Sequence, residues 1–485
     1  MDNKNTHALP SDASGASRLT ELEAQYGGPA LVVVPGTKGT LKVAANQPLM
    51  AALFAEETLI LREPQLGSFF SYGEETGVWT AITDDSLLMK LDQLVLRLAR
   101  DACLPHLETS RLRKRSLLGD LVSLLKGLVE QRDIFETRLP LIVTANGVLR
   151  PDDNGFAFTE HHPAYYARHA SPISYEPSEG CPQFEAFLNH CLPDVADRRL
   201  VQAVAGMWLL GHNLTQSIVL FHGKGQTGKS TLLAILRGLI GRHNCSELRT
   251  AHLGGRFEMF NYLNKSLLIG SDVPGDFLCK DGAEALKKLT GEDLISVEKK
   301  YGDTVEMVAS LNVGITSNSK LRVKLQDDAE AWRRRLVIVE FTAPKPAKPE
   351  PRLGQRLLVE EGSGILNWAL GGVYTLIEED WRLPLASKHK LSVEDLLEAS
   401  DSLGSFLRHA LESSDDSDLS TEELCSAYRD YCQLRGWEPI ASVERQMKSA
   451  VEEQLGISQS HDLKRGNSTC RGFRGLRIKG GSSHA

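Results

Sequence analysis

Residues 217–230 read S-I-V-L-F-H-G-K-G-Q-T-G-K-S and decide the fold of this 485-residue chain. From Gly223 to Ser230 they fit the pattern G-x-x-x-x-G-K-[ST] at every fixed position. The run before the loop is rich in β-formers and too short for a helix, whereas residues 230–240 place leucines at helical spacing. A strand, a glycine loop and a helix in this order are the context that the pattern requires. The stretch therefore predicts a phosphate-binding loop for ATP in an α/β domain.

Each position of this loop has an expected task. Glycines let backbone N–H groups face the phosphates, and the start of the following helix adds its dipole. Lys229 is expected to reach the β- and γ-phosphates, and Ser230 is expected to hold Mg²⁺. The expected nucleotide contacts are Gly223, Gly225, Gln226, Thr227, Gly228, Lys229, Ser230 and Thr231.

Two apolar runs downstream end in polar residues that would complete such a site. Residues 267–270 predict a strand that leads to Asp272, whose carboxylate would serve Mg²⁺ and the attacking water. Residues 311–316 predict another strand, which leads to Asn318. An amide at that point hydrogen-bonds the γ-phosphate or orients the water. Asp272 and Asn318 are thus the expected catalytic partners of Lys229, and Asp272 and Ser230 the expected contacts of Mg²⁺.

Basic residues follow in two places. Arg333 and Arg334 precede a predicted strand, and an arginine supplied across a subunit boundary neutralises charge in the transition state of ATP hydrolysis. Between them and the loop, residues 295–298 and 304–309 predict two short strands around a basic tip. Lys299 and Lys300 at this tip would grip a phosphate backbone. A solvated surface patch is the alternative for the arginines, and a solvated hairpin tip for the lysines.

The segment 201–341 resembles the superfamily 3 helicases, small AAA+-related motors of viruses, phages and plasmids. It is similar above all to the phage and plasmid primase-helicase family, which includes the poxvirus-type enzymes. The upstream and terminal parts also resemble that family, in the domain that precedes its motor and in its winged-helix tail. The shared phrases are A-N-G-V-L-R at 145–150, C-P-Q-F-E-A-F-L at 181–188, K-K-L-T-G-E-D at 287–293, V-E-K-K-Y at 297–301, I-T-S-N at 315–318, W-R-R-R-L-V-I-V-E-F at 332–341 and S-G-I-L-N-W-A-L-G-G at 363–372.

The chain departs from this family in two respects. The family usually has Glu where this chain has Asp272, which leaves the catalytic base open. The first 180 residues show neither a D-x-D on an apolar strand nor an acidic Toprim pattern, so primase activity is not supported by the sequence. Carried over residue by residue, the resemblance implies nucleotide and Mg²⁺ binding by Gly228, Lys229 and Ser230, a Walker B acid at Asp272, a sensor at Asn318, a finger at Arg333 or Arg334, and a DNA-gripping hairpin at Lys299 and Lys300.

Composition limits the other classes of protein. The formal net charge is −8, so any contact with nucleic acid must come from local basic patches. The eight cysteines form no C-x-x-C pair and no set at zinc-finger spacing, which predicts reduced thiols. Cys245 and the histidines near it are expected to be ordinary core or surface residues rather than metal ligands. No apolar run approaches a membrane span, and the polar first 17 residues do not resemble a signal peptide. A cytoplasmic protein, in a bacterial host, without a membrane partner is therefore expected.

The expected fold is an AAA+-like P-loop ATPase core with an α+β N-terminal domain and a C-terminal winged-helix domain. Basic residues gather in the terminal unit, where a wing would place them against a phosphate backbone, although a tail that binds acidic protein is the competing interpretation. The expected divisions are a flexible lead at 1–17, the N-terminal domain at 18–180, the ATPase core at 181–341, a proline-rich linker and helical segment at 342–418 with an acidic hinge at 413–418, and the winged helix at 419–485. The basic residues are Lys464, Arg465, Arg471, Arg474, Arg477 and Lys479.

These patterns together predict an ATP-dependent DNA helicase of a phage, plasmid or integrated element, acting in replication as a ring-shaped translocase on single-stranded DNA. A finger that acts on a neighbouring subunit requires a homo-oligomer, and a hexamer is expected. Its expected partners are single-stranded and forked DNA and a primase or polymerase. The alternative is a nucleotide-switched origin-binding or loader protein that recruits replication proteins without unwinding. A small-molecule P-loop kinase is a third possibility, which leaves the basic hairpin and tail without a purpose.

Overall fold

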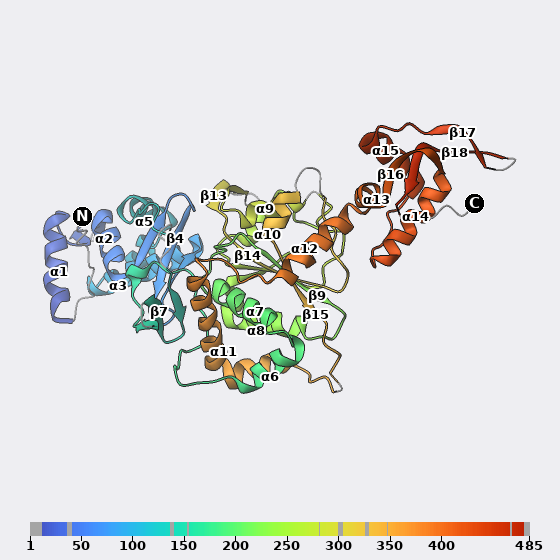
Figure 1. Cartoon of the computed structure of the whole chain (residues 1–485). Coiled ribbons are helices and arrows are strands. Elements are labelled where there is room, and N and C mark those ends of the chain that lie inside the picture. The colour runs from blue at the N-terminus through green and yellow to red at the C-terminus, as the bar shows by residue number, and fades with distance from the viewer. Residues whose placement is uncertain are drawn as a thin grey trace. The chain divides into compact units, whose positions relative to one another are not determined.

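The computed structural model describes residues 12–35, 41–135, 140–152, 155–280, 282–298, 304–324, 329–346, 348–465 and 468–479. The chain is a mixed α/β protein that divides into two compact units. The first unit runs up to Glu176 and also includes residues 294–308. The second unit comprises residues 177–293 and the chain from Ala309 onward. Figure 1 labels the elements of both units.

The first unit has a helical core and small antiparallel sheets. Leu87, Leu91 and Val95 recur every four residues on one helix and are buried, as are Leu121 and Leu125 on another. The elements of this unit are α1 (Asp12–Gln25), β1 (Leu31–Pro35), β2 (Leu41–Ala45), α2 (Gln47–Glu57), β3 (Ile60–Glu63), β4 (Ser68–Gly73), β5 (Val78–Ile82), α3 (Asp84–Asp101), α4 (His106–Leu112), α5 (Arg115–Leu128), β6 (Ile142–Thr144), β7 (Gly147–Asp152), β8 (Gly155–Thr159), β12 (Leu294–Glu298) and β13 (Thr304–Val308).

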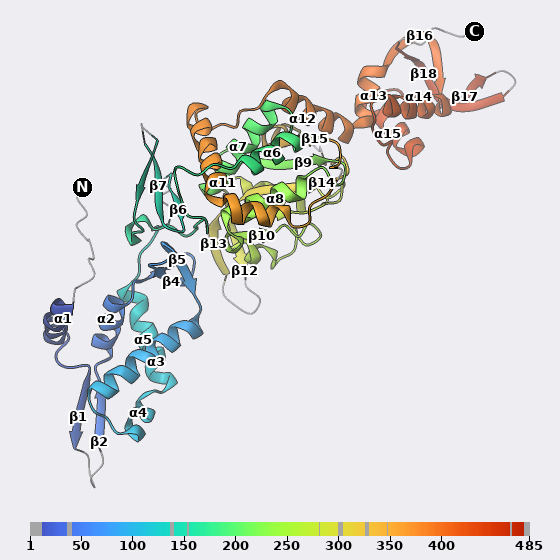
Figure 2. The ribbon, with the colours of Figure 1, turned by 90° about the horizontal axis from the view of Figure 1, so that it is seen from below.

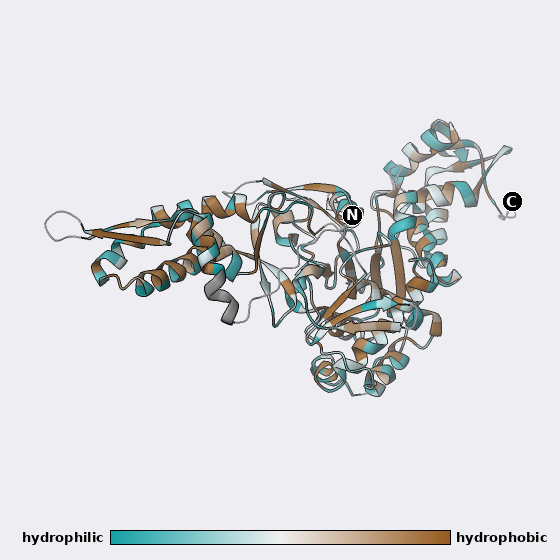
Figure 3. Cartoon of the chain, turned by 90° about the vertical axis from the view of Figure 1, so that its left-hand side faces the viewer, coloured by the Kyte–Doolittle hydropathy of each residue, from teal (hydrophilic) through white to brown (hydrophobic). Residues whose placement is uncertain are grey.

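Helices and strands both occur in this unit, as expected for an α+β domain. Its β-rich runs near residues 31 and 40 form β1 and β2, and its longer amphipathic stretches form α3 and α5. The helix α1 begins at Asp12, so the expectation of a flexible lead is wrong for residues 12–17. The paired strands β1 and β2 are largely brown in Figure 3, and β1 carries three exposed valines, Val32, Val33 and Val34.

The second unit is built on a five-stranded parallel sheet with strand order β10-β11-β14-β9-β15. In a parallel sheet all strands end at the same edge, so loops that follow different strands lie next to one another there. The elements of this unit up to the last strand of the sheet are α6 (Pro182–Cys191), α7 (Val195–Leu209), β9 (Ile218–Gly223), α8 (Lys229–Ile240), β10 (Cys245–Glu247), β11 (Leu267–Gly270), α9 (Gly282–Thr290), β14 (Asn312–Ser317), α10 (Ala329–Arg335) and β15 (Leu336–Phe341).

Helices cover both faces of this sheet. The Phe221 ring of β9 packs edge-to-face against Trp208 of α7 and against Phe341 of β15. Leu220, the neighbour of Phe221 on β9, points to the opposite face, where α12 (Ser387–Ser400) lies. This alternation follows from the two-residue period of a strand.

The helix α11 (Leu353–Glu378) packs against the helices of the parallel-sheet unit rather than forming part of a linker. Its backbone approaches α7 so closely that a Cβ on Gly372 would lie 1.8 Å from the Gln202 carbonyl oxygen. A Cβ on Gly364 would lie 2.0 Å from the Gly180 carbonyl oxygen. Figure 2 shows α11 beside α7 and α8. The glycines of the phrase at 363–372 are therefore packing residues, and the helical segment predicted to follow the core is part of it.

Described residues 402–479 form the C-terminal module, which has its own core around Phe406, Tyr428, Met447 and Phe473. Its three strands are antiparallel in the order β16-β18-β17. The acidic hinge predicted at 413–418 is wrong, because these residues belong to the strand β16, which pairs with β18 at Ser413 and Asp418 and is irregular between them. The elements are α13 (Ser402–Ala410), β16 (Leu411–Ser420), α14 (Thr421–Leu434), α15 (Val443–Leu455), β17 (Ser460–Arg465) and β18 (Ser468–Ile478).

Among the described residues, no helix is both long and apolar enough to cross a membrane.

Candidate active site

The glycine loop lies between β9 and α8, as its sequence predicts, and two of its glycines are required by their surroundings. Gly223 has φ 147°, and a Cβ there would lie 2.3 Å from the carbonyl oxygen of Phe341. Gly228 has φ 99°, and a Cβ there would lie 2.3 Å from Sγ of Cys191 on α6. L-residues rarely adopt these conformations, and no side chain fits either place. The loop is therefore fixed between β15 and α6.

The start of α8 is open to an anion. Its N-cap is Gly228, which has no side chain to accept a hydrogen bond from the first turn. Thr227 closes the loop from within, because its Oγ1 donates to the carbonyl oxygen of Lys224 at 2.9 Å. Ser230 is exposed at the first turn. Uncapped N–H groups and the positive end of the helix dipole make this N-terminus suited to bind phosphate.

Lys229 is the buried cation of the site, with 5% of its surface exposed. Its Nζ donates to the carbonyl oxygens of Gly223 at 2.6 Å and Lys224 at 2.7 Å. It also donates to Oδ1 of Asn318 at 3.0 Å. Burial lowers the pKa of Lys229, and the nearby carboxylate of Asp272 opposes that change. The ammonium group thus lies across the loop and is held mainly by neutral acceptors.

Asp272 and Asn318 meet Lys229 at the carboxyl edge of the sheet. Strand β14 lies between β9 and β11, so the residue that follows β14 faces the ends of both neighbours. Asn318 uses this position: its Oδ1 accepts from Lys229, and its Nδ2 donates to Oδ1 of Asp272 at 2.6 Å. The three residues predicted separately as cation, acid and sensor are therefore joined in one chain of hydrogen bonds.

The two candidate arginines lie on α10 and differ in their surroundings. Nε of Arg333 donates to Glu394 of α12 at 2.6 Å, and the same guanidinium pairs with Glu330. Arg334 is exposed and makes no ion pair with the residues that the structure describes. Within the same described residues, neither arginine hydrogen-bonds to Lys229, Asp272 or Asn318. Arg334 is thus the more accessible of the two arginines, since ion pairs hold Arg333.

Lys299 and Lys300 lie outside the described residues. The strands on either side of them, β12 and β13, pair antiparallel from Leu294 and Val308 to Glu298 and Thr304. The predicted hairpin is confirmed to that extent.

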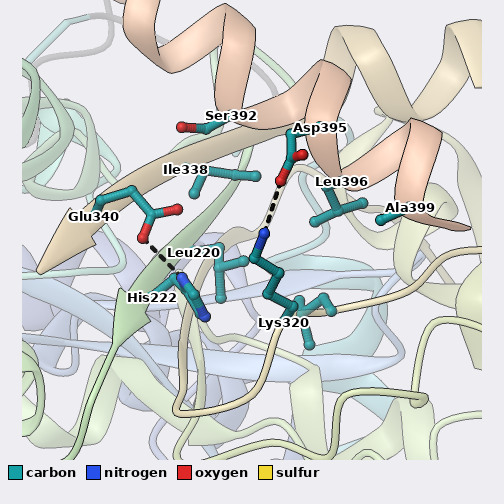
Figure 4. Close-up of a pocket in the computed structure, with 10 residues that line it drawn as sticks. Leu220, His222, Lys320, Ile338, Glu340, Ser392, Asp395, Leu396 and Ala399 are labelled. Carbon is teal, nitrogen blue, oxygen red and sulfur yellow. Dashed lines mark hydrogen bonds and ion pairs between the residues drawn. The ribbon is translucent and has the colours of Figure 1, made fainter. Parts of the chain in front are cut away.

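A pocket that the sequence did not indicate lies between the sheet and α12 (Figure 4). On one side of it, Nδ1 of His222 on β9 and a carboxylate oxygen of Glu340 on β15 form a hydrogen bond of 2.7 Å. Lys320, two residues after Asn318, pairs with Asp395 of α12 at 2.9 Å on the other side. Asp395 also accepts from Nε1 of Trp437 in the C-terminal module at 3.0 Å. The loop that follows Asn318 is thus connected to that module through the carboxylate of Asp395.

A further surface that the sequence analysis missed lies on the chain segment that connects β10 to β11. Phe257 is 44% exposed there, and the Arg256 guanidinium lies 5.5 Å from its ring centre. The neighbouring Glu258 is buried and accepts from Nε of Arg249 at 3.0 Å and from the Tyr262 hydroxyl at 2.8 Å. A buried carboxylate thus fixes the loop that presents this aromatic ring. In the sequence, the signal for this surface was the adjacent pair Arg256 and Phe257.

Three of the six basic residues singled out in the C-terminal module, Arg465, Arg474 and Arg477, are already paired with acids. Lys464 and Arg471 are exposed and make no ion pair with the described residues. On α15, Arg445 and Lys448 are likewise exposed, and the sequence analysis did not select them. The paired residues are Arg465 with Glu423 at 2.8 Å, Arg474 with Asp462 at 2.9 Å, and Arg477 with Glu412, whereas Lys479 donates to the Arg408 carbonyl oxygen at 3.0 Å.

All eight cysteines are free thiols. In the part of the chain that the structure describes, no group of three or more His, Cys, Asp or Glu side chains is placed to hold a metal ion. Cys245 is partly buried, and burial raises the pKa of its thiol to about 12.

Two family models match the chain. Residues 50–193 match a model described as D5 N terminal like, and residues 221–335 match a family of unknown function, DUF5906. The first match supports the resemblance to the phage primase-helicase family, and the second covers the segment that holds Lys229, Asp272 and Asn318.

Two of the similar solved structures come from one protein. "The apo structure of NrS-1 C terminal region (305-718)" is 14% identical, with a TM-score of 0.49, and covers 89% of this chain and 99% of its own. "The A form apo structure of NrS-1 C terminal region-CTR" is 13% identical, with a TM-score of 0.47, and covers 87% of this chain and 97% of its own. Both are distant likenesses and assign no residue.

Proposed function

We propose that this chain is an ATP-dependent DNA helicase of a phage, plasmid or integrated element, of the superfamily 3 type, which acts in replication. The observation that carries the proposal is the meeting of Lys229, Asn318 and Asp272 beside an uncapped helix N-terminus. A cation, an amide and a carboxylate at that place are what phosphoryl transfer to water requires. The D5 N terminal like match supports the replicative setting.

ATP with Mg²⁺ fits the residues of this edge. The N–H groups at the start of α8 receive no side-chain cap from Gly228 and would receive phosphate oxygens. The exposed hydroxyl of Ser230 and the carboxylate of Asp272 supply oxygen atoms, which are the ligands that Mg²⁺ prefers. When bound, the ion neutralises charge on the phosphates.

Lys229 would act as the link between phosphate binding and catalysis. A phosphate oxygen is a stronger acceptor for its ammonium than the two carbonyl oxygens and the amide that hold it in this structure. As Lys229 turns to the phosphate, Oδ1 of Asn318 loses its donor and becomes free to orient a water molecule. The Asp272 carboxylate, held by Nδ2 of Asn318, would accept the proton of that water.

The chain would act as a homo-oligomeric ring, for which we propose a hexamer. Arg334 would be supplied to the site of the next subunit, since it is exposed and without an ion pair in the described chain. Its guanidinium would stabilise charge that develops on the transferred phosphoryl group. Arg333 would instead hold α10 against α12 through Glu394.

Three elements would contact DNA. The β12–β13 hairpin would present Lys299 and Lys300 to single-stranded DNA, and Phe257 would stack on its bases. The C-terminal module has the order helix, strand, two helices, two strands, and the last strand lies in the middle of its sheet, which supports a winged helix. Its DNA contacts would then come from the unpaired Lys464 and Arg471 and from α15.

The domain division follows from these assignments. The N-terminal domain precedes the ATPase core, the core extends through α11 and α12, and the winged helix begins with α13 at Ser402. A primase or polymerase, expected as a protein partner, would act on the strand that the ring separates.

The decisive experiment measures ATP hydrolysis with and without single-stranded DNA, together with unwinding of forked DNA. Lys229→Ala should lower turnover by more than about 100-fold, because it removes a preorganised cation from developing charge. Lys224→Ala is the matched control, since it removes the same charge from an exposed position of the same loop. It should retain hydrolysis within about twofold.

The outcomes separate the rival functions. Unwinding by the wild type that Lys229→Ala abolishes supports the helicase. DNA binding switched by nucleotide without unwinding would favour the loader, and hydrolysis that DNA does not stimulate would favour a kinase-like enzyme. Equal activity of both variants would overturn the assignment of the loop.

A further inference from the structure

The turn after β11, which presents Asp272, is held by β14 rather than by its own strand. Asp272 has φ 49°, in the left-handed region that non-glycine residues rarely occupy. Such a conformation persists only where the surrounding structure holds it. The turn is followed by Val273, which is buried, so the backbone folds back toward the sheet directly after the acid.

One residue of β14, Thr316, accepts hydrogen bonds from both backbone N–H groups of this turn, those of Asp272 and Val273. Its Oγ1 accepts a hydrogen bond from the Asp272 N–H at 2.9 Å. Its carbonyl oxygen accepts from the Val273 N–H at 3.0 Å. Thr316 is itself only 2% exposed, so its side chain is fixed by packing. The next residue, Ser317, adds a third bond by donating from Oγ to the Val273 carbonyl oxygen at 3.2 Å.

The sensor amide is carried by the same strand. Asn318 directly follows β14 and donates to the Asp272 carboxylate at 2.6 Å. The backbone of the acid and the side chain that orients its carboxylate are therefore both attached to β14. Their relative position would persist through a movement of β11, because both contacts lie on one rigid strand.

We infer that Thr316 is a positioning residue for ATP hydrolysis: its hydroxyl fixes the left-handed backbone of Asp272 and so sets the place of the carboxylate against Asn318 and Lys229. This inference rests on the proposed ATPase. The hydroxyl, rather than the shape of the side chain, does this, because a methyl group in place of Oγ1 leaves the Asp272 N–H without its acceptor. The turn then relaxes toward right-handed conformations, which redirect the carboxylate.

The test compares Thr316→Val, which keeps the shape, with Thr316→Ser, which keeps the hydroxyl. Thr316→Val should lower kcat by about 10- to 100-fold, the effect of misplacing a reacting group by about 1 Å, with KM for ATP changed by less than about threefold. Thr316→Ser should restore kcat to within about threefold of wild type. Thr375→Val is the matched control, since Thr375 is also buried and donates to a carbonyl oxygen in α11. Its kcat should be that of the wild type.

A second comparison shows whether Thr316 acts through the acid. In an Asp272→Asn background, measured in single turnovers, Thr316→Val should change the rate by less than about twofold, because the carboxylate it positions is gone. An equal loss in both backgrounds, or in Thr316→Val and Thr316→Ser alike, would overturn the inference. If a thermal unfolding measurement shows that Thr316→Val is not folded, Thr316→Ala takes its place in the comparison. If the wild-type chain does not hydrolyse ATP, the proposed function itself is refuted. The comparison of Lys229→Ala with Lys224→Ala tests that function independently of Thr316.

Discussion

The edge of the parallel sheet and the C-terminal module both contain charged side chains that the sequence singled out, but these side chains meet different partners. At the sheet edge, Lys229, Asn318 and Asp272 meet one another across separate segments of the chain. In the module, Arg465 and Arg474 meet acids that the sequence analysis did not consider.

The difference has a physical cause. Residues at the ends of adjacent parallel strands must lie close together, because the strands are joined by backbone hydrogen bonds in a fixed register. A long basic side chain on a surface has no such constraint and pairs with any acid in reach. Motifs at strand ends are therefore good guides to a site, whereas a window of basic residues is a poor guide to which of them are available.

Substitution of the two arginines of α10 tests this comparison, and its expected effect on kcat is the largest of the three. Arg334→Ala should lower kcat by about 10³-fold or more, because an arginine finger is worth that much in phosphoryl transfer. Arg333→Ala should cost less than about tenfold, since Glu330 and Glu394 already hold its guanidinium. Steady-state ATPase assays measure both.

Mixing Arg334→Ala protein with Lys229→Ala protein should restore part of the activity, because one intact site then forms between unlike subunits. No restoration at any ratio would remove the support for action between subunits. If Arg333→Ala lowers kcat more than Arg334→Ala does, the ion pair between Arg333 and Glu394 must open when the ring forms.

The wing of the C-terminal module gives a smaller effect. Replacing both Lys464 and Arg471 with Ala should lower the salt dependence of forked-DNA binding by about two units of slope, one for each phosphate that the variant no longer neutralises. Replacing Arg474 and Arg477, which lie with Arg471 on β18, removes the same charge and is the matched control. Their slope should change by less than about half as much, since both are paired with acids.

Binding of forked DNA across a salt series measures these slopes. Identical slopes for the two double variants would show that the ion pairs open on DNA. If both double variants have the slope of the wild type, the basic residues of β17 and β18 do not contact DNA, and an acidic protein becomes their proposed partner.

The Glu423–Arg465 pair gives the smallest effect, on stability alone. The hydrogen bond from Arg465 holds the pKa of Glu423 at about 2, below its ordinary value of 4.5. The carboxylate therefore stabilises the module above about pH 4.5, and this contribution is lost as the pH falls toward 2. Because the side chain is 45% exposed, solvent screening limits the contribution to about 1 kcal/mol.

Glu423→Gln should thus lower the free energy of opening of α14 by about 1 kcal/mol at pH 7, and the difference from wild type should vanish toward pH 2. Hydrogen exchange of residues 421–434 measures this opening. Glu422→Gln, on the same turn but without the ion pair, is the control and should not change it. A difference that stays constant with pH would show that Glu423 acts by capping the helix rather than through its charge.

The sequence alone determined the local features of this protein. The strand, glycine loop and helix at 217–240 follow from β-formers, glycines and leucines at spacings that each structure requires, and the structure has β9 and α8 there. The apolar runs that become β11, β14 and β15 were also readable, because a buried parallel strand needs a continuous apolar stretch. The polar residues at their ends could then be named as candidates.

Only the tertiary structure decided which of these candidates meet and which are already engaged. The strand order places β14 beside β9, which joins Asn318 to Lys229 across 89 residues. The left-handed turn at Asp272, its hydrogen bonds to Thr316 and the pairing of Arg333 with Glu394 likewise involve residues far apart in the chain. A local window contains propensity and periodicity, whereas these contacts depend on which surfaces become neighbours when the core closes, and that choice is made by the packing of the whole chain.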